Sequence, residues 1–574
     1  MRSRIRPLPF RTLPLAAVVA AALGGGPLVR AAEKPDVIAV VACDGYSELR
    51  DQLNWIGEQV GNPTLAGFAE SFLLLATQGK GLAGLDVKRP VGIVVTTEGG
   101  PLPTVHGFVP VKDLGKLLNS LQSMTGPVED RDGVRRLSVP GGPAVEIVDR
   151  DGWAIVSQEG SGSGPADPLA LIEPVAKEYS IGVEIFPARM PHDMRERLKG
   201  LLEEAARNAA DQGQPMDPGP LEDAIENLQD VEKLALGLAV NKEKDLVAVD
   251  VTAVMVPGSA AADLWADAGK TASTVGSPAS TDGKPAAVRA HYAQAVPAAA
   301  RAAIEAGLAQ ALPADADDPI AGVVAPLLRD IAAAMLETGA VDAGFTLDVS
   351  DASSTAPLPA VTIGMKVKDG AALEKKVKER LGKKDSLPPG VTVKFDAGMQ
   401  GDARLHEVSV GLEGNPLADQ IGNTVTLTLA VAPQYAYLLV GGDVPKRLAA
   451  AMAAGGKPIA TAAPLTGIDV SLASLVAYAA KMTQAFQPGD PQGDMLADVA
   501  EQAADKKSTQ VQFTVKPVPR GVTLRLSADA GALQTIAAGA MNGGGGPPPG
   551  PRPAVRLRPS AEKVPAGGAP ALAP

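Results

Sequence analysis

The chain has 574 residues with a formal net charge of −12, one cysteine, four histidines, 3% aromatic residues and 45% hydrophobic residues. The single cysteine excludes an intramolecular disulfide framework and cysteine-based zinc or iron–sulfur sites. The acidic balance argues against a nucleic-acid partner, because such binding needs basic residues that neutralise phosphates. The hydrophobic fraction is too high for a disordered chain, and the length allows two to four domains.

Residues 1–31 have the pattern of an export signal. A basic segment without acidic residues precedes a short apolar core from Leu13 to Leu23, and small residues follow at 29–31. The core is shorter than the roughly 20 residues that a spanning helix needs. We therefore expect cleavage, and a periplasmic or secreted protein, with an uncleaved signal anchor as the alternative. The basic segment consists of Arg2, Arg4, Arg6 and Arg11.

Removal of this signal takes away five arginines and no acidic residue, which lowers the formal charge from −12 to −17. Such a surface favours neither nucleic acid nor anionic lipid. No later segment is long and apolar enough to span a membrane. Cys43 follows Val40-Val41-Ala42, which loosely resembles the acylation motif of a bacterial lipoprotein. Charged residues at 33–36 separate it from the apolar core, so we interpret Cys43 as a structural residue within a strand.

Five segments share one pattern, in which a β-rich run leads to a helix-capping residue and then to an amphipathic helix. Residues 361–367 show it well: alternating apolar residues predict a half-buried strand, and Asp369 caps the helix that follows. Each of these strands has a predicted hairpin partner just before it, which indicates antiparallel pairing. The five strands are predicted at 105–111, 246–256, 361–367, 435–440 and 522–526, and their partners at 91–95, 234–240, 345–349, 425–431 and 511–515.

A second element recurs upstream of the hairpins, where a strand is followed by a long helix and usually by another helix. Combining both elements predicts an α+β fold with repeated strand–helix–helix–hairpin–helix units and mainly antiparallel sheets. Four copies begin near residues 37, 180, 288 and 466, and the first and third continue into further strands. This order suggests a long–short–long–short duplication. An ordinary α+β chain without internal repeats remains the alternative.

The predicted organisation follows from these copies. A Gly, Ser, Thr and Pro-rich stretch near residues 270–284 is interpreted as a linker. From Asn542 the chain is rich in glycine and proline and locally basic, and we predict a disordered tail. The predicted segments are a signal at 1–31, units at 32–179 and 180–270, a linker at 271–287, units at 288–465 and 466–541, and a tail at 542–574.

Motifs for phosphate, dinucleotide or nucleophile chemistry do not emerge from the sequence. Gly269-Lys270-Thr271 would end a phosphate-binding loop, but Leu264 stands where that loop needs glycine. The glycines and serines at 160–164 are out of phase for a nucleophile elbow, and Ser560 with Lys563 lies in the predicted tail. We therefore assign no catalytic residue and no cofactor.

We also assign no residue to a metal site or a carbohydrate site. The four histidines are His106, His192, His291 and His406, and their spacing matches no zinc motif. The acidic cluster at 315–318 lacks the glycine and distal glutamate of a calcium loop. Trp55, Trp153 and Trp265 are interpreted as packing residues. A basic stripe on one helix should pair with Glu374 and Glu379; it comprises Lys375, Lys376, Lys378 and Arg380.

The export signal, the alanine-rich repeated units and the Pro/Gly-rich tail resemble large exported bacterial proteins of unknown function with repeated α+β modules. The resemblance extends over residues 1–540 and transfers no functional residue, because no specific motif carries it.

Three hypotheses about function remain open. The first is a non-catalytic exported protein of the cell envelope that binds a partner protein or ligand through apolar clefts between its units. The second is a hydrolase whose site is assembled from distant residues, which requires acids, bases or nucleophiles to converge in one pocket. The third is a carrier of lipid or other apolar cargo, which requires a continuous apolar cavity.

Overall fold

The fold is seen in a computed structural model, which describes most of the chain between Asp36 and Gly543. The described residues are 36–97, 103–131, 134–138, 144–161, 164–165, 167–211, 228–268, 273–275, 286–296, 298–311, 319–349, 358–383, 387–413, 418–455 and 464–543. The predicted signal, most of the predicted linker and the predicted tail beyond Gly543 lie outside these residues.

The first half of the chain, residues 36–268, contributes ten strands. Their bounds are β1 Asp36–Cys43, β2 Val91–Thr97, β3 Thr104–Pro110, β4 Val128–Arg131, β5 Val134–Ser138, β6 Ala144–Arg150, β7 Trp153–Gln158, β8 Ile181–Ile185, β9 Val231–Asn241 and β10 Leu246–Met255. Its helices are α2 Tyr46–Gln59, α3 Leu65–Ala76, α4 Leu114–Thr125, α5 Leu169–Glu178, α6 His192–Asp211 and α8 Ala260–Ala268, with short 3₁₀ turns at 187–189, 228–230 and 242–244.

The second half, residues 286–543, contributes ten more strands. Their bounds are β11 Val288–Ala295, β12 Ala340–Asp348, β13 Ala360–Lys366, β14 Val391–Gln400, β15 Ala403–Gly411, β16 Thr424–Ala432, β17 Tyr435–Val440, β18 Thr466–Ser471, β19 Gln510–Val518 and β20 Gly521–Asp529. Its helices are α9 Ala298–Ala311, α10 Pro319–Leu336, α11 Gly370–Leu381, α12 Ala418–Ile421, α13 Val444–Ala454, α14 Leu472–Phe486, α15 Pro491–Ala504 and α16 Ala530–Gly543.

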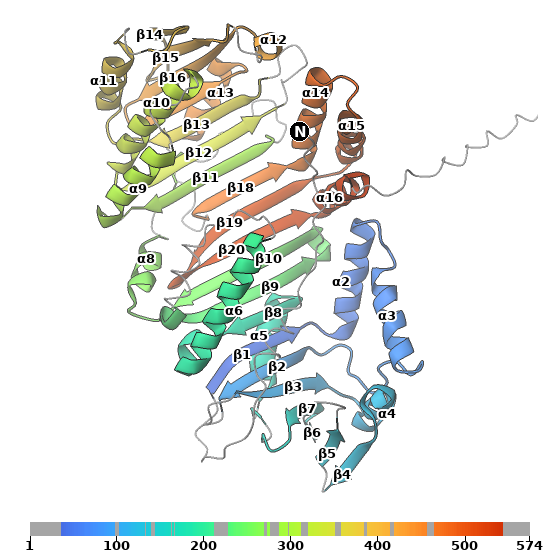
Figure 1. The fold of residues 1–574 in the computed structure, drawn as a ribbon. Helices are drawn as coiled ribbons and strands as arrows, with labels where there is room; N and C mark the ends of the chain where they lie inside the picture. The colour runs from blue at the N-terminus through green and yellow to red at the C-terminus, as the bar shows by residue number, and fades with distance from the viewer. Residues whose placement is uncertain are drawn as a thin grey trace, which may run out of the picture.

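All twenty strands join in one antiparallel sheet, and the two halves meet where β10 pairs with β20 (Figure 1). Outward from this junction the first half places β10, β9, β8, β1, β2, β3, β7, β6, β5 and β4. The second half places β20, β19, β18, β11, β12, β13, β17, β16, β15 and β14. The two orders correspond strand for strand.

The junction itself is symmetric about its centre. Hydrogen bonds from backbone N–H groups close both ends of the ladder, from Ala530 to the carbonyl of Asp245 at 2.9 Å and from Met255 to the carbonyl of Arg520 at 2.8 Å. At the centre, the guanidinium of Arg525 donates two hydrogen bonds to the carboxylate of Asp250, at 2.7 and 2.6 Å. A local two-fold axis therefore passes between Asp250 and Arg525.

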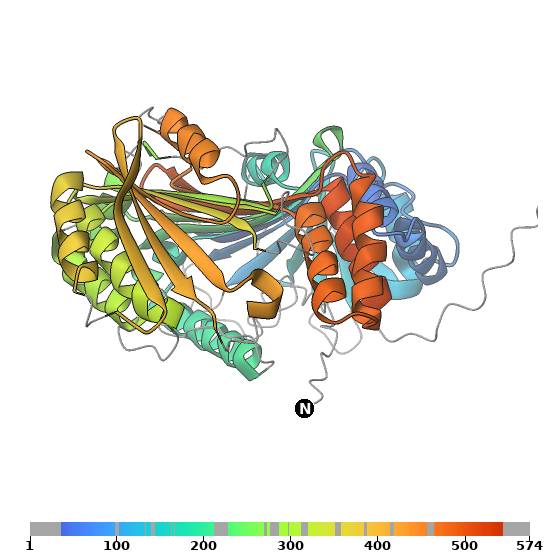
Figure 2. The ribbon, with the colours of Figure 1, turned by 90° about the horizontal axis from the view of Figure 1, so that it is seen from above.

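The helices lie on two sides of the sheet. Seen from above, α5 and α13 lie on one face and α6 on the opposite face, while helices of both halves stand beyond the strand ends (Figure 2). We call the face under α5 and α13 the back face and the other the front face. In the second half, α10 and α11 cover the front face over a core that includes Leu327, Ile331, Val377, Leu429 and Leu438.

On the back face, α5 fits closely because small residues line the strands beneath it. The ring of Tyr179, just after α5, lies over Gly182 of β8 and Gly237 of β9. A Cβ atom at Gly182 would come within 2.6 Å of Val175 and 2.9 Å of Tyr179, and one at Gly237 would overlap the ring. The absence of these two side chains thus lets α5 bury Ile172, Val175 and Tyr179.

Several sequence predictions are confirmed by the pairing and the caps. The five expected hairpins are present as β2–β3, β9–β10, β12–β13, β16–β17 and β19–β20. Asp113, Asp369 and Asp443 cap α4, α11 and α13 by accepting backbone hydrogen bonds. Ser259 accepts one from Ala262 at the start of α8. The α+β class and the antiparallel pairing follow from these elements. Among the described helices, none combines the length and apolarity needed to cross a membrane.

One segment of the predicted linker is docked onto the second half. Ser273 and Thr274 donate hydrogen bonds of 2.7 Å from their hydroxyl groups to the buried carboxylate of Asp342 on β12. The side chain of Val275 lies near Gly364 on the back face. This part of the linker is therefore anchored by a buried carboxylate.

Replacing Gly237 with alanine should destabilise the fold, because the new Cβ overlaps the Tyr179 ring. We expect Gly237→Ala to lower the free energy of unfolding by about 1–3 kcal/mol, measured by chemical denaturation. Gly107→Ala is the matched control, because its added Cβ would lie 3.5 Å from Val156, an ordinary contact. Equal stability of Gly237→Ala and the unmodified chain would contradict this packing.

Candidate functional site

An uninterrupted set of apolar side chains crosses the front face at the middle of the sheet. Directly opposite residues in antiparallel strands share a face, and so do residues two apart along a strand. One row of paired residues crosses the junction through Val249 and Leu526, and a parallel row crosses through Val251 and Leu524. We call the set the apolar strip, made of Ile181, Leu236, Leu238, Val249, Val251, Leu526, Leu524, Phe513 and Val515.

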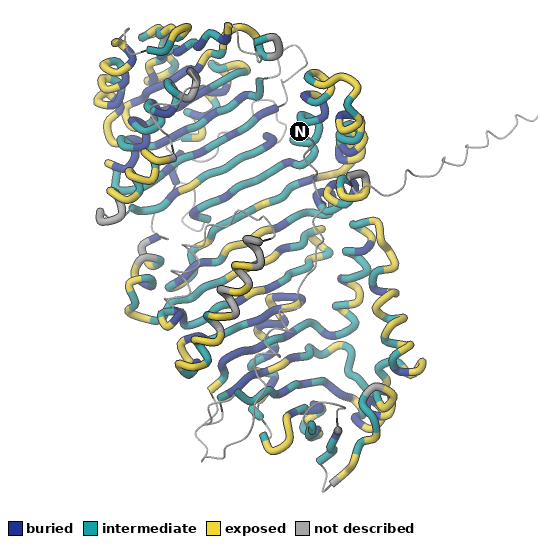
Figure 3. The backbone as a smooth tube through the Cα atoms, viewed as in Figure 1, coloured by how far each residue is buried: buried dark blue, intermediate teal, exposed yellow. Residues whose placement is uncertain are grey.

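The apolar strip is open to solvent where the halves meet. The side chains of Val249, Val251, Leu524 and Leu526 keep 40%, 42%, 37% and 52% of their surface exposed. Figure 3 shows exposed and intermediate segments along these central strands. Further along the same face, Ile93 on β2 and Tyr292 on β11 are 38% and 39% exposed. The strip is roughly 20 Å wide across its five strands, and the exposed row continues beyond it on both sides.

Polar residues of the same strands point to the back face instead. Lys233 and Glu184 form an ion pair at 2.8 Å between β9 and β8. Thr252 and Thr523 share a hydrogen bond at 2.9 Å across the junction, next to Asp250 and Arg525. The central strands therefore place their charges and hydroxyl groups on the back face and apolar side chains on the open front face.

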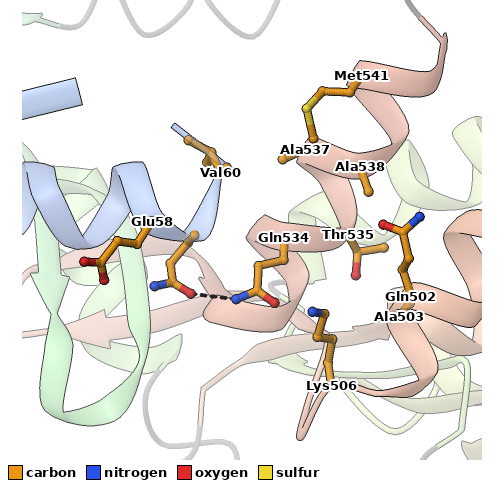
Figure 4. A pocket seen from close by; sticks show the side chains of 12 residues that line it. Glu58, Val60, Gln502, Ala503, Lys506, Gln534, Thr535, Ala537, Ala538 and Met541 are labelled. Carbon is orange, nitrogen blue, oxygen red and sulfur yellow. Dashed lines mark hydrogen bonds between the residues drawn. The ribbon is translucent and has the colours of Figure 1, made fainter. Parts of the chain in front are cut away.

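A pocket of about 320 Å³ lies between α2 of the first half and α15 and α16 of the second half (Figure 4). The amide of Gln534 donates a hydrogen bond of 2.7 Å to the side-chain oxygen of Gln59 across it. Glu58 and Lys506 also line it, and its lining contains neither histidine nor serine. Its mixed polar lining does not form a set of acid, base and nucleophile.

His106 and Ser157 form a pair that the sequence did not suggest. His106 on β3 lies opposite Ser157 on β7, and its Nδ1 atom is 2.8 Å from the serine hydroxyl. Both side chains are buried, and a Cβ at Gly164 would lie 2.8 Å from the imidazole. Burial lowers the pKa of His106 to about 4. The pair is therefore enclosed within the fold, and His106 is neutral at neutral pH.

His406 lies beside two carboxylates, Glu374 and Asp396, in a group whose ligand atoms lie within 4.8 Å of one another. Such a group resembles a metal site, but two cations already occupy it. Lys378 contacts Glu374 at 2.8 Å and Asp396 at 2.9 Å, and Arg404 contacts Glu374 at 3.0 Å. A metal ion would have to displace both cations, so the donor set fits a network of ion pairs beside the buried His406 better than a metal centre.

The pKa values in this network follow from its neighbours. Burial lowers the pKa of His406 below its usual range despite the nearby carboxylates. Burial raises the pKa of Glu374, but hydrogen bonds from Lys378 and Arg404 outweigh it and leave the pKa lowered. These shifts keep the histidine neutral and the carboxylate ionised at neutral pH.

The remaining sequence candidates are separated by the fold. His106, His291 and His406 lie on β3, β11 and β15, far apart in the strand order, and His192 is exposed at the start of α6. Trp153 is buried, with its ring edge-on to Phe108. The predicted packing role of Trp153 is thereby supported, and no pair of histidines is brought together by strand pairing.

Cys43 lies at the end of β1, paired with Val91 and Ile181. Burial raises the pKa of its thiol, so it lacks the features of an activated nucleophile. Its place within a paired strand fits the structural interpretation of this residue.

The basic stripe on α11 is paired as expected. Lys378 and Lys375 contact Glu374 and Glu379 at 2.8 and 3.9 Å. A further partner on α10 was not predicted. The buried Asp330 accepts two hydrogen bonds from Arg380, at 2.5 and 2.9 Å, and contacts Lys376 at 3.2 Å. Two residues of the basic stripe therefore link α11 to α10.

Comparison of the chain with protein-family models, curated proteins and solved structures found no match.

The buried His106 should make stability depend on pH. In the unfolded chain its pKa is near 6.5, so it gains a proton below that pH, whereas folded His106 stays neutral down to about pH 4. The unfolded state therefore binds more protons in this window, and stability falls as the pH drops from about 6.5 to about 4, by about 3 kcal/mol for this residue.

Equilibrium unfolding across this pH range tests the point in His106→Asn, which keeps a polar group facing Ser157 but does not titrate. We expect its stability to fall less steeply than that of the unmodified chain between about pH 6.5 and about pH 4. Identical slopes for His106→Asn and the unmodified chain would contradict the assignment.

Proposed function

We propose that the mature chain is a non-catalytic exported protein of the bacterial cell envelope that binds an apolar segment of a partner protein on its apolar strip. The observation that carries this proposal is the row of half-exposed apolar side chains on the front face of β8, β9, β10, β20 and β19. Contiguous exposed apolar surface of several hundred Å² is uncommon on a monomer and marks binding sites. The export signal expected at residues 1–31 supports the location.

The width of the exposed surface supports a partner segment of limited size. The apolar strip is roughly 20 Å wide across its five strands, and α6 lies on the same face of the sheet (Figure 2). A single polypeptide segment in helical or extended form matches a surface of this width. Burying about 500 Å² of apolar surface contributes about 12 kcal/mol before the costs of association.

Lipid or small apolar cargo is the competing occupant, and hydrolysis is the competing activity. The strip is an open surface rather than an enclosed cavity, which favours a segment of a macromolecule over a small apolar molecule. His106 and Ser157 are buried, and the carboxylates near His406 are held by Lys378 and Arg404. These features support binding rather than hydrolysis.

We also propose that the chain arose by duplication of a long–short pair of units. The identical strand order of the two halves supports this. The hairpin loops before β10 and β20 differ in length, but each ends on a left-handed residue at an equivalent position, Asp245 with φ of 52° and Arg520 with φ of 61°. Gly182 and Gly467 occupy equivalent places on β8 and β18, where they pair with Ala42 and His291 of β1 and β11.

Two charged substitutions in the apolar strip should weaken binding without unfolding the chain. We expect the mature protein to bind a fluorescein-labelled 14-residue Leu/Ala peptide, measured by fluorescence anisotropy. Val251→Glu/Leu526→Glu should weaken this binding at least about tenfold, since the bound peptide would desolvate both carboxylates. Because Val251 and Leu526 are exposed in the free protein, the melting temperature of the double variant should stay close to that of the unmodified chain.

Met399→Glu is the matched control. Met399 is also an exposed apolar residue, at 59%, but it lies on the edge strand β14, and its replacement should leave the affinity unchanged. Undiminished peptide binding by the double variant would overturn the proposed site. Displacement of the peptide by palmitate at equal affinity would instead favour the lipid-carrier alternative.

A further inference from the structure

The charged pair on the local two-fold axis has a consequence for which strands can pair. The register places Asp250 opposite Arg525. The pairs on either side are arranged symmetrically about this one, as expected if Asp250 and Arg525 are equivalent positions of two like halves. Asp250 is 1% exposed, and both oxygens of its carboxylate accept hydrogen bonds from Arg525. Equivalent positions thus carry opposite charges, which two identical halves could not do.

A second ion pair lies toward one end of the same junction. Arg520, in the loop before β20, donates a hydrogen bond of 2.6 Å to Glu232 and one of 2.9 Å to the carbonyl of Met255. The position in the first half equivalent to Arg520 is Asp245. A first half paired with its own copy would place Asp245 against Glu232, and both members of this contact would be negative.

We infer that Asp250 and Arg525 make the junction selective, so that β10 pairs with β20 and rejects β10 of a second copy. This inference rests on the two-half arrangement proposed above. Pairing of two first halves would bring two aspartates together on the axis, and pairing of two second halves would bring two arginines together. Asp250 is 1% exposed, whereas the side chain of Arg525 is 48% exposed, so two aspartates meeting there would be the more strongly disfavoured of the two wrong pairings.

Selective pairing matters because each half ends in an inner edge strand. Each half alone would present β10 or β20 as a long unpaired edge, and exposed edges pair readily with other chains. The outer ends of the sheet are protected differently, since the edge strand β14 is interrupted by an irregular register near Asp396, a residue with φ of 54°. The charge pair directs the two inner edges to each other.

The test uses the full chain with a protease site inserted between residues 277 and 284 and cleaved after folding. The cleaved complex is unfolded in denaturant, refolded by dilution, and its pairs are counted by native mass spectrometry. We expect more than about nine in ten pairs to join a first half to a second half, where unselective pairing would give about half. In the cleaved Asp250→Asn/Arg525→Gln variant, pairs of like halves should increase severalfold.

Near-statistical pairing of the unmodified halves would overturn the inference, and so would a neutral variant that pairs as selectively as the original. If the cleaved halves do not refold, uncleaved chains decide the matter. Asp250→Arg and Arg525→Asp should each lower the yield of refolded monomer, and Asp250→Arg/Arg525→Asp should restore it. A charge-exchanged variant as defective as the single ones would also overturn the inference.

Two controls distinguish selective pairing from a general effect of changed charge and from the proposed peptide binding. Lys394→Glu/Glu407→Lys reverses an exposed pair, 3.5 Å apart on β14 and β15, and should change neither yield nor pairing. Peptide binding by uncleaved Asp250→Asn/Arg525→Gln should match that of the unmodified chain, because the pair lies on the back face. If the unmodified halves pair without selectivity while peptide binding is intact, only the pairing inference fails. If pairing is selective but no peptide binds, only the proposed function fails.

Discussion

The antiparallel contact between β10 and β20 is the interaction on which the rest of this structure depends. It joins two ten-stranded halves into one sheet, and it places Asp250 and Arg525 against each other on a local two-fold axis. Without that contact each half would keep an exposed inner edge, and the apolar strip would be cut in two, since Val249 and Val251 come from one half and Leu526 and Leu524 from the other. Assembly of the sheet and assembly of the proposed binding surface are therefore one event.

The two faces of the central strands have opposite characters, and the difference explains where function can reside. The back face is polar or lacks side chains, so that Tyr179 can lie on Gly237 while Asp250 and Arg525 pair nearby. The front face is apolar at the central strands, and α10 and α11 cover it in the second half. Groups with the chemistry of catalysis, such as His106 and Glu374, are buried or neutralised by neighbours. Among the described residues of the central strands, the accessible side chains of the front face are apolar.

Local features could be predicted from the sequence because they depend on neighbouring residues. Alternation of apolar residues identified the five hairpins, and Asp369 and Ser259 identified helix starts. The union of all strands in one sheet could not be predicted, because strand order depends on contacts between residues more than 200 positions apart, as for Asp250 and Arg525. The apolar strip escaped prediction for a related reason: alternation shows that one face is apolar but not whether a helix covers it.

The most direct test of this account is a cysteine pair that reports the register of the junction. In a Cys43→Ser background, Thr252→Cys/Thr523→Cys replaces two residues that lie directly opposite, with their hydroxyl oxygens 2.9 Å apart. We predict rapid formation of an intramolecular disulfide on mild oxidation, and none in Thr252→Cys/Ser527→Cys, where the positions are four residues out of register and the Asp250–Arg525 pair is kept. Preferential cross-linking of the out-of-register pair, or cross-linking between molecules alone, would contradict the central claim that β10 and β20 of one chain join the two halves.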